Sequence, residues 1–447
     1  MVSYFFPPAG SVGVHRTLRF IKSLPAFGWN PVVLTASNAK VGNLEPSLLD
    51  KVAADVEVCR SRSFEALNYG KLIDGVQSKP LPSIVSKLCV GVPRDVWKYV
   101  AIPDEKLSWN PFAIRAGAKI LKEQKIDAIY VTGKPFSSYF IGHSLSQRFG
   151  IPWIMDLRDL WVLNRRMRPK TSVHERLEAW MERRFVRSAS VVVVNTPGNQ
   201  RDFAERYPEL PAEKFVTITN GFDRDDFAGD NPPKYDRFTI GYSGAFYFQR
   251  PEYRTFYRRL FGLQRKRLNI YETYSPKFLF EAVTLLFQER PELRDRVQFV
   301  FSGPGCQKIE CLVDEYGLQR NVKLLGWVTY QESLELLRRS HVLCVTLSRG
   351  EESEGWIPSK LYQYMGAGNP ILGLVPNGDV RNIIEETETG VAVPPDDVQQ
   401  IKTAISRMYA DYENRLAFQP KSGSVENYEG RFLTAKLVDC LERAVGV

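Results

Sequence analysis

The stretch that says most about the fold reads Gly355-Trp356-Ile357-Pro358-Ser359-Lys360-Leu361-Tyr362-Gln363-Tyr364-Met365-Gly366-Ala367-Gly368-Asn369-Pro370-Ile371-Leu372. Proline suits the first turn of a helix, because its backbone angle is already helical and the N–H that it lacks would have no partner there. Pro358 therefore predicts the start of a helix. The free amides from Ser359 to Leu361 would attract a phosphate, and Lys360 adds positive charge.

Gln363 lies three residues after Lys360, so both side chains would project from one face of this helix. A diphosphate at the helix start would leave Gln363 within reach of a hydroxyl of a ribose or a sugar. The sequence thus predicts that Ser359, Lys360 and Gln363 bind one ligand that carries a diphosphate and a ribose or sugar. The alternative, a short helix with a solvated lysine, stays open.

Short apolar runs recur along the whole chain, beginning with a brief one at Val2–Phe6. The others are Pro31–Thr35, Ala128–Thr132, Trp153–Asp156, Val191–Asn195, Thr239–Ser243, Val297–Ser302, Val322–Leu325, Val342–Leu347 and Pro370–Leu374. An apolar run without alternation indicates a strand buried on both faces. Segments with helix caps, such as Ser333–Ser340, separate the runs, so we expect an α/β fold with doubly wound parallel sheets.

The chain has 447 residues, which is too long for one ordinary core, so two domains are expected. A polar, turn-rich boundary near residues 222–237 separates a Rossmann-like domain at 1–222 from a second one at 237–420. The last segment, 421–447, holds a helix with an apolar stripe that needs a hydrophobic partner. The stripe consists of Leu433, Leu437, Leu441 and Val445.

Composition restricts the class of partner. Sixty lysines and arginines against 51 acidic residues give a net charge of +9, which suits phosphate-bearing ligands or an anionic membrane and does not indicate nucleic acid. Six cysteines without CxxC or zinc spacing predict free thiols and no metal site. Without a long apolar run or a signal peptide, the expected location is the cytoplasm, free or peripheral at the inner face of the membrane.

Small residues follow several of the predicted strands. Gly10, Ser11 and Gly13 precede the first helix, Gly244 follows the strand that ends at Ser243, and Gly305 follows another strand. Small residues let backbone amides approach a ligand, and a helix start favours anions. We therefore expect these residues to bind the same phosphate-bearing ligand, although tight turns without a ligand would have the same sequence.

A second charged motif follows the buried strand at Trp153–Asp156. It places Asp156, Arg158 and Asp159 at the carboxyl end of the strand, where open α/β sheets bind ligands. A structural ion pair, Asp156–Arg158 or Arg158–Asp159, would explain two of the three charges. Asp159 is the residue that we expect to face the ligand.

Two segments stand out by charge. Residues 158–187 carry nine basic and four acidic side chains, and residues 250–267 carry seven basic side chains and one acid, interleaved with aromatic residues. The second segment separates a strand from its helix, which places it at the functional edge of the sheet. It predicts a contact with an anionic membrane or with a lipid that carries a diphosphate, a lid over the phosphate-bearing ligand, or a solvated hairpin. Arg250 or Lys277 would support the diphosphate of that ligand.

The motifs together resemble the retaining glycosyltransferases of family 4, which have the GT-B fold. The resemblance spans nearly the whole chain and is carried by Phe6–Gly13, Pro152–Trp161, Asn220–Phe222, Gly241–Phe246, Leu325–Val328 and Ile357–Leu372. It implies two Rossmann-like domains facing across a cleft, with the last helix returning to the first domain. The Pro-Ser-Lys helix would bind the nucleotide diphosphate of a nucleotide-sugar donor.

The chain departs from the family pattern at three positions. Gln363 stands where the family has the second of two paired glutamates, which typically holds the ribose. The first would fall at Gly355, with Glu354 one place away. Tyr139 stands where a histidine is common in the acceptor site. Gln363 still offers hydrogen bonds but no charge.

The resemblance implies a metal-independent transfer without a cofactor, from a nucleotide sugar to a glycan or lipid-linked acceptor, in surface polysaccharide biosynthesis. In the mechanism commonly drawn for the fold, the leaving phosphate takes the acceptor proton, so positioning and charge stabilisation matter more than a base. We expect Asp159 and Lys360 to carry the catalysis. A nucleotide-sugar epimerase of the same fold and a non-catalytic, regulatory nucleotide-sugar-binding protein remain as alternatives.

Overall fold

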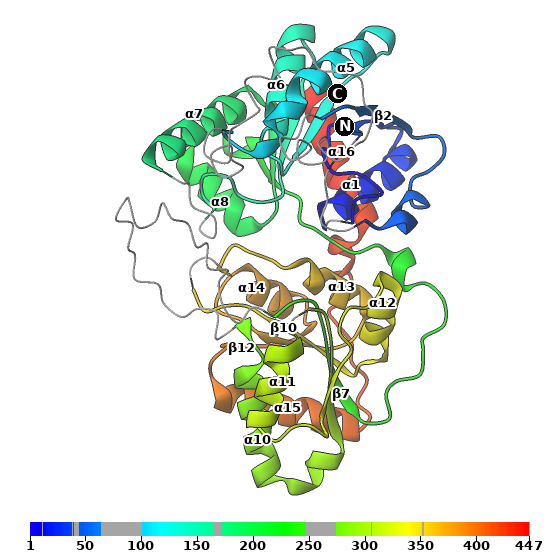
Figure 1. Ribbon diagram of the computed structural model, residues 1–447, viewed down its shortest axis with the longest axis vertical. Helices are drawn as coiled ribbons and strands as arrows, with labels where there is room; N and C mark the ends of the chain where they lie inside the picture. The colour runs from blue at the N-terminus through cyan, green and yellow to red at the C-terminus, as the bar shows by residue number, and fades with distance from the viewer. Residues whose placement is uncertain are drawn as a thin grey trace, which may run out of the picture. The chain divides into compact units, whose positions relative to one another are not determined.

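The computed structural model describes residues 1–10, 12–37, 39, 44–63, 101–164, 171–246, 274–304, 306–350 and 353–446 (Figure 1). The chain forms two compact units. The first domain consists of Met1–Thr219 together with Gly430–Val447, and the second domain consists of Asn220–Glu429. Each domain has its own parallel sheet and its own core.

The first domain contains six strands and six α-helices among its described residues. The strands are β1 (Val32–Ala36), β2 (Glu57–Ser61), β3 (Ile129–Gly133), β4 (Trp153–Leu157), β5 (Val191–Val194) and β6 (Phe215–Thr217). The helices are α1 (Val12–Ser23), α5 (Asn110–Glu123), α6 (Ser138–Phe149), α7 (Ser172–Ser188), α8 (Pro197–Arg206) and α16 (Gly430–Val445).

The strands of the first domain are all parallel. β3, β4, β5 and β6 pair in that order, and β1 pairs with β2. Val2 bridges Leu34 of β1 and Val131 of β3, so the two sets of strands adjoin through the start of the chain. The strand predicted at Val2–Phe6 is thus reduced to one bridging residue, because the chain turns away after it.

Helices cover both faces of this sheet. Core residues of α5 to α8, such as Ala113 and Phe185, pack on one side. On the other side, Phe20 of α1 packs with Leu433 and Leu437 of α16. Figure 1 shows α16 beside α1. The prediction that the last helix returns to the first domain is confirmed, and its apolar stripe forms the contact.

The second domain contains six strands and six α-helices among its described residues. The strands are β7 (Phe238–Ser243), β8 (Val297–Ser302), β9 (Val322–Leu324), β10 (Val342–Thr346), β11 (Ile371–Leu374) and β12 (Gly390–Val393). The helices are α10 (Lys277–Glu289), α11 (Cys306–Glu315), α12 (Tyr330–Arg339), α13 (Ser359–Ala367), α14 (Asp379–Glu386) and α15 (Val398–Glu413).

The six parallel strands follow the order β12-β11-β10-β7-β8-β9. From β7 the chain builds outward through β8 and β9, and β10 then starts the other half of the sheet on the opposite side of β7. Strand order therefore reverses between β7 and β10, which is where open α/β sheets bind ligands at their carboxyl ends. α10, α11 and α15 cover one face, and α12, α13 and α14 cover the other.

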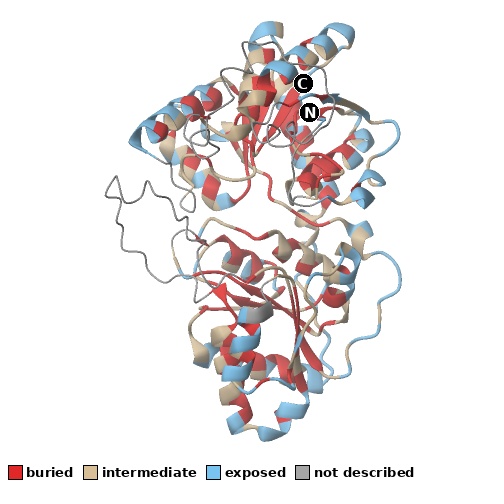
Figure 2. Cartoon of the chain, in the orientation of Figure 1, coloured by how far each residue is buried: buried red, intermediate tan, exposed pale blue. Residues whose placement is uncertain are grey.

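Burial explains which elements the sequence predicted. The central strands lie between two layers of helices and are almost entirely buried (Figure 2). Three strands went unpredicted, namely β2, β6 and β12, and each ends a row of paired strands. Such strands are short or carry polar residues, so they lack the apolar run that marks a central strand. Among the described residues, no helix combines the length and the apolar character needed to cross a membrane.

Candidate active site

The start of α13 lies at the point of the second sheet where strand order reverses. Pro358 precedes the helix in an extended conformation, and no side chain caps the first turn. The other end is closed by Gly368, whose φ of 72° is left-handed. The backbone amides of Ser359 and Lys360 are therefore not taken by a cap, as the sequence predicted for an anion-binding helix start.

Lys360 points from this turn to the end of β7. Its Nζ donates a hydrogen bond of 2.6 Å to the hydroxyl of Tyr242 and lies 3.8 Å from the centre of that ring. A Cβ atom on Gly244 would come within 2.8 Å of the same Nζ. The structure thus brings together Lys360 and Gly244, which are 116 residues apart in the sequence. Both residues were predicted from the sequence to lie in one site.

The surroundings of Lys360 disfavour its charge. Although the residue as a whole is only partly buried, its amino group is enclosed, and this burial lowers the pKa of Lys360 to about 7. Burial also raises the pKa of the neighbouring Cys344 thiol to about 12, so the thiol remains neutral and supplies no counter-charge. An anion at the helix start would supply that charge and would restore the protonated lysine.

Two tyrosines that the sequence did not single out hold this arrangement. Tyr242 stacks on Phe246, with ring centres 3.9 Å apart. Tyr364 accepts a hydrogen bond of 3.1 Å from the backbone N–H of Ser243, which ties α13 to the end of β7. Tyr364 lies four residues after Lys360 in the same helix, so helical spacing was a signal that could have identified it.

The glycine turns at neighbouring strand ends pack directly on each other. Gly244 donates a backbone hydrogen bond of 2.8 Å to Ser302, and Gly303 donates one of 2.7 Å to Gly326. Gly303 has a φ of +133°, and a Cβ atom there would lie 2.2 Å from the carbonyl oxygen of Gly244. Only glycine therefore allows this close approach at position 303.

Gln363 has a partner in the second domain. Its side chain forms a hydrogen bond with the hydroxyl of Tyr330, which donates 2.8 Å to a carboxylate oxygen of Asp226. Burial, followed by the charge of Asp226, raises the pKa of Tyr330 far above its usual range. Lys277 begins α10, and its ammonium lies 5.6 Å from the centre of the Phe278 ring.

In the first domain, Asp156 at the end of β4 is fully engaged by protein groups. Arg16 donates to both of its oxygens, at 3.0 and 2.8 Å, and the hydroxyls of Tyr130 and Thr132 also donate to it. Arg16 and Asp156 are almost completely buried. Asp156 therefore has a structural role, but its partner is Arg16 and not Arg158, because α1 places Arg16 beside β4.

Arg158 instead contacts the end of β3 and the glycine-rich loop, Gly10–Gly13, at the start of α1. It donates to the carbonyls of Gly133 and Lys134, at 2.7 and 2.6 Å. Its Nη1 lies 1.0 Å from the position that a Cβ atom on Gly13 would take, so the guanidinium fills the space above that glycine at the start of α1. Burial lowers the pKa of Arg158. Gly10, in the same loop, is partly exposed.

Asp159 is the most accessible charge of this motif. Its carboxylate pairs with Lys134 at 3.3 Å, and the two side chains are 41% and 34% exposed. Tyr139, by contrast, is fully buried and donates 2.8 Å to the carbonyl of Asp156. Tyr139 therefore stabilises the end of β4 from within the core, whereas Asp159 is accessible to a ligand.

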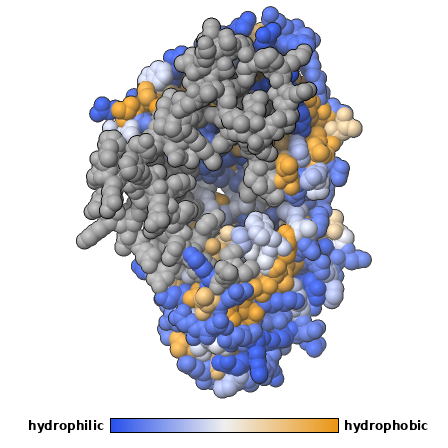
Figure 3. Space-filling model, viewed as in Figure 1, coloured by the Kyte–Doolittle hydropathy of each residue, from blue (hydrophilic) through white to orange (hydrophobic). Residues whose placement is uncertain are grey.

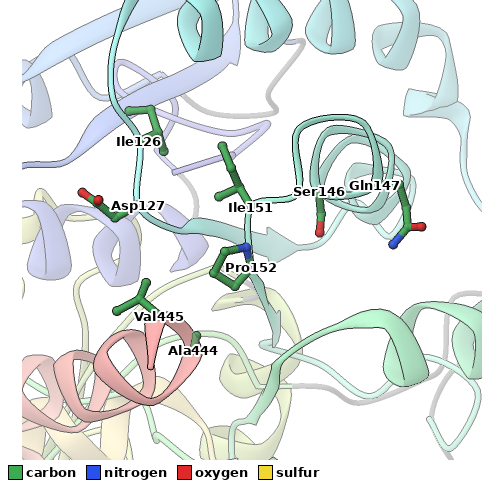
Figure 4. Close-up of a pocket in the computed structure, with 9 residues that line it drawn as sticks. Ile126, Asp127, Ser146, Gln147, Ile151, Pro152, Ala444 and Val445 are labelled. Carbon is green, nitrogen blue, oxygen red and sulfur yellow. The ribbon is translucent and has the colours of Figure 1, made fainter. Parts of the chain in front are cut away.

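Three predicted donor-binding residues, Ser11, Arg250 and Gly305, lie outside the described residues, and so does the basic segment 250–267. Within the described ranges, no group of three or more metal-binding side chains occurs. A hollow of about 610 Å³ opens in the first domain between Asp127, Pro152 and Val445 (Figure 4). It lies at the amino ends of β3 and β4, the edge opposite to the motif of Asp159.

Two family models match the chain. Residues 13–221 match the model described as glycosyl transferase 4-like domain, and residues 267–422 match the one described as glycosyl transferases group 1. Alpha-D-kanosaminyltransferase from Streptomyces kanamyceticus is 23% identical over 287 residues, which are 62% of this chain and 66% of that protein. The chain thus spans slightly less than two thirds of the length of this curated relative.

Solved structures share the fold over the full length. The crystal structure of Anabaena Alr3699/HepE in complex with UDP and glucose has a TM-score of 0.58 at 14% identity, and the match covers 99% of this chain and 98% of that one. The apo form of the lipopolysaccharide outer core galactosyltransferase WaaB has a TM-score of 0.55 at 13% identity, with 99% of both chains covered. The chain therefore belongs to the group 1 (family 4) glycosyltransferases and has the GT-B fold.

Proposed function

We propose that the protein is a retaining glycosyltransferase that transfers a sugar from a nucleotide-sugar donor to a glycan or lipid-linked acceptor in surface polysaccharide biosynthesis. The observation that carries this proposal is the start of α13, which has no side-chain cap and holds Lys360 at the reversal point of the second sheet. Charge, free amides and position there all favour a diphosphate.

The donor diphosphate would be held by the amides of Ser359 and Lys360 and by the Lys360 ammonium. Gly244 leaves the space that the phosphate needs, since its backbone approaches Lys360 without a side chain in between. Gln363, one helical turn further along α13, would bind a ribose or sugar hydroxyl. Lys277 at the start of α10 would add charge to the same edge.

The transfer itself needs no group beyond donor and acceptor. The bond between the sugar C1 and the phosphate oxygen breaks, and the acceptor oxygen forms a bond to C1 on the same face. The acceptor proton passes to the leaving phosphate oxygen. In this scheme Lys360 stabilises the charge that develops on the leaving diphosphate, as a preorganised cation does.

The acceptor would be bound by the first domain. Asp159 is accessible there and would orient an acceptor hydroxyl. We propose the cytoplasm as the site of action, where nucleotide sugars are available. The described cysteines, Cys59, Cys311, Cys344 and Cys440, are free thiols, which fits a reducing compartment.

A thermal-shift screen against UDP-, GDP-, ADP- and TDP-sugars tests the donor first. UDP-glucose opens the series, because the HepE structure is described as a complex with UDP and glucose. A ligand that binds only the native state raises the melting temperature, by an amount that grows with its concentration relative to Kd. No shift with any donor would contradict the proposed donor site.

The donor found in this way then separates enzyme from binder. Incubation with the radiolabelled sugar nucleotide should release nucleotide diphosphate, and faster in the presence of an acceptor glycan or lipid. NMR of the product should show the anomeric configuration of the donor retained. Release of an isomerised nucleotide sugar would identify an epimerase, and binding without any turnover would identify a non-catalytic nucleotide-sugar-binding protein.

A further inference from the structure

The outer face of α7 exposes large apolar side chains that the fold does not use. Val173 is 61% exposed, Leu177 41% and Trp180 59%. They recur at intervals of four and three residues, so they form one stripe along the helix. A contiguous exposed apolar stripe of this kind often marks a binding surface.

Arginines flank this stripe along one side and at its C-terminal end. Arg184 continues it by one more turn, and its guanidinium lies 5.8 Å from the centre of the Trp180 ring. Arg176, Arg183 and Arg187 are exposed along one side. Two of them, Arg183 and Arg187, share the exposed Glu209 at 3.5 and 2.8 Å, which neutralises part of the charge. Arg176 and Arg184 are the basic groups nearest the apolar residues.

The acidic residues of α7 lie on other sides of the helix. Glu175 and Glu178 precede Trp180 by five and two residues, which corresponds to about 140° and about 200° around the helix axis. Glu182 is buried and binds Tyr207, Arg206 and the backbone N–H of Val162. The apolar stripe is therefore bordered by positive charge and separated from negative charge.

The opposite side of α7 fixes the helix to its domain. Met181, Phe185 and Val186 are buried in the core of the first domain. Figure 2 shows α7 with one buried and one exposed side, and Figure 3 shows hydrophobic and hydrophilic residues adjoining at the edge where Figure 1 places α7. The exposed stripe thus lies on a helix whose opposite side is anchored in the core of the first domain.

We propose that the outer face of α7 docks the protein on an anionic membrane surface. Trp180, Leu177 and Val173 would enter the boundary between headgroups and acyl chains, which is where tryptophan is enriched. Arg176 and Arg184 would bind the lipid phosphates. Charge complementarity favours a lipid surface over a second copy of the chain, because two such faces would bring arginines together.

This surface lies in the first domain, whereas the proposed donor site lies in the second. It contains no residue of the segment 250–267, which lies outside the described residues. It accounts for part of the basic stretch 158–187 that the donor site leaves unused. A protein held in this way would meet lipid-linked acceptors at the membrane. Vesicle binding needs neither donor nor catalysis, so its failure and the failure of the proposed transfer are distinguishable.

The test is vesicle co-sedimentation of the full chain, with phosphatidylcholine alone and with equimolar phosphatidylcholine and phosphatidylglycerol. We expect binding to the anionic vesicles that weakens with salt and is much lower on neutral ones. Arg176→Ser/Arg184→Ser should lower the partition coefficient by about thirtyfold. Leu177→Ser/Trp180→Ser should lower it by more than about tenfold.

A matched control removes an apolar and a basic residue from another exposed helix of the same domain. Phe112→Ser/Arg115→Ser on α5 should pellet like the wild type. Melting temperatures show that each variant is folded. Equal binding of the α7 variants and the wild type would overturn the proposal. Dimerisation of the wild type that the Trp180 variant abolishes, without vesicle binding, would overturn it in favour of a second copy.

Discussion

Both sheets carry a charged side chain at their carboxyl edge, but the two charges are held in different ways. Asp156 of the first domain receives hydrogen bonds from Arg16, Tyr130 and Thr132, and the ion pair is almost completely buried. The ammonium of Lys360 in the second domain has three N–H groups, and one of them donates a hydrogen bond to the hydroxyl of Tyr242. Asp156 is therefore saturated by the protein, whereas Lys360 retains the capacity to bind an anion.

This difference teaches that position at a strand end does not by itself mark a functional residue. A charge whose partners all come from the protein contributes to stability. A charged group that burial disfavours, and that still has N–H groups available for hydrogen bonds, can bind a ligand of opposite charge. Changing one residue of each kind should therefore affect different measurements.

The largest expected effect is on stability, for Asp156→Asn. The variant leaves Arg16 buried without a counter-charge, which costs about 3–5 kcal/mol of the free energy of unfolding. Denaturant titration measures this loss. Glu292→Gln is the control, because it breaks an exposed pair with Arg290 and should leave the free energy of unfolding almost unchanged. Equal stability of the Asp156 variant and the wild type would remove the distinction drawn above.

The next effect is on donor binding, for Lys360→Ala. Loss of a charge-assisted hydrogen bond to the diphosphate should weaken binding by about 1–3 kcal/mol. Calorimetric titration with the donor found in the screen measures it, and Lys323→Ala, an exposed lysine on β9, controls for net charge. Unchanged affinity in a folded Lys360→Ala protein would show that the diphosphate binds elsewhere.

Asp156 and Lys360 also show which features of the structure could be predicted from the sequence. The buried runs at β7, β8, β10 and β11 and the motif of α13 were predicted, because burial on both faces and a proline at a helix start leave a local signal. The residues that pair with Asp156 and Lys360 leave no such local signal in the sequence. Arg16 and Asp156 are 140 residues apart, and Tyr242 and Lys360 are 118 apart, so only the fold pairs them.

The pH dependence sharpens the role of Lys360. Burial lowers its pKa to about 7, and only the protonated form binds phosphate strongly. Donor affinity should be constant below this pH and fall by up to about tenfold per unit above it, until the higher pKa in the complex is reached. Titrations from about pH 6 to about pH 9 test this, and Lys360→Arg should lack the slope because arginine stays charged.

Stability without donor should change in the opposite direction. Between about pH 7 and the unfolded-state pKa of about 10.4, the unfolded chain binds a proton that the folded lysine has lost. The free energy of unfolding should therefore rise with pH in this window, and this contribution should disappear in Lys360→Ala. A donor affinity that increases with pH would contradict the assigned sign.

A smaller effect on binding is expected for Gln363→Leu. The hydroxyl of Tyr330 keeps Asp226 as a partner, so the stability of the fold should change little. A hydroxyl of the bound nucleotide sugar would lose its partner, which should weaken binding by about 1–3 kcal/mol. Gln363→Glu should be tolerated, because a carboxylate also accepts from hydroxyls. Wild-type donor affinity in the leucine variant would remove Gln363 from the site.

The smallest change in stability is expected for Asp159→Asn. The pair with Lys134 is more than one-third exposed on each side, so breaking it should cost less than about 1 kcal/mol. If Asp159 orients the acceptor, the transfer rate should nevertheless fall while donor affinity stays the same. Lys134→Met breaks the same pair and keeps Asp159, so it should retain most of the transfer. An equal loss of transfer in both variants would mean that the ion pair, and not the carboxylate, supports the acceptor. Asp159 would then resemble Asp156, as a charge at a strand end that serves the fold.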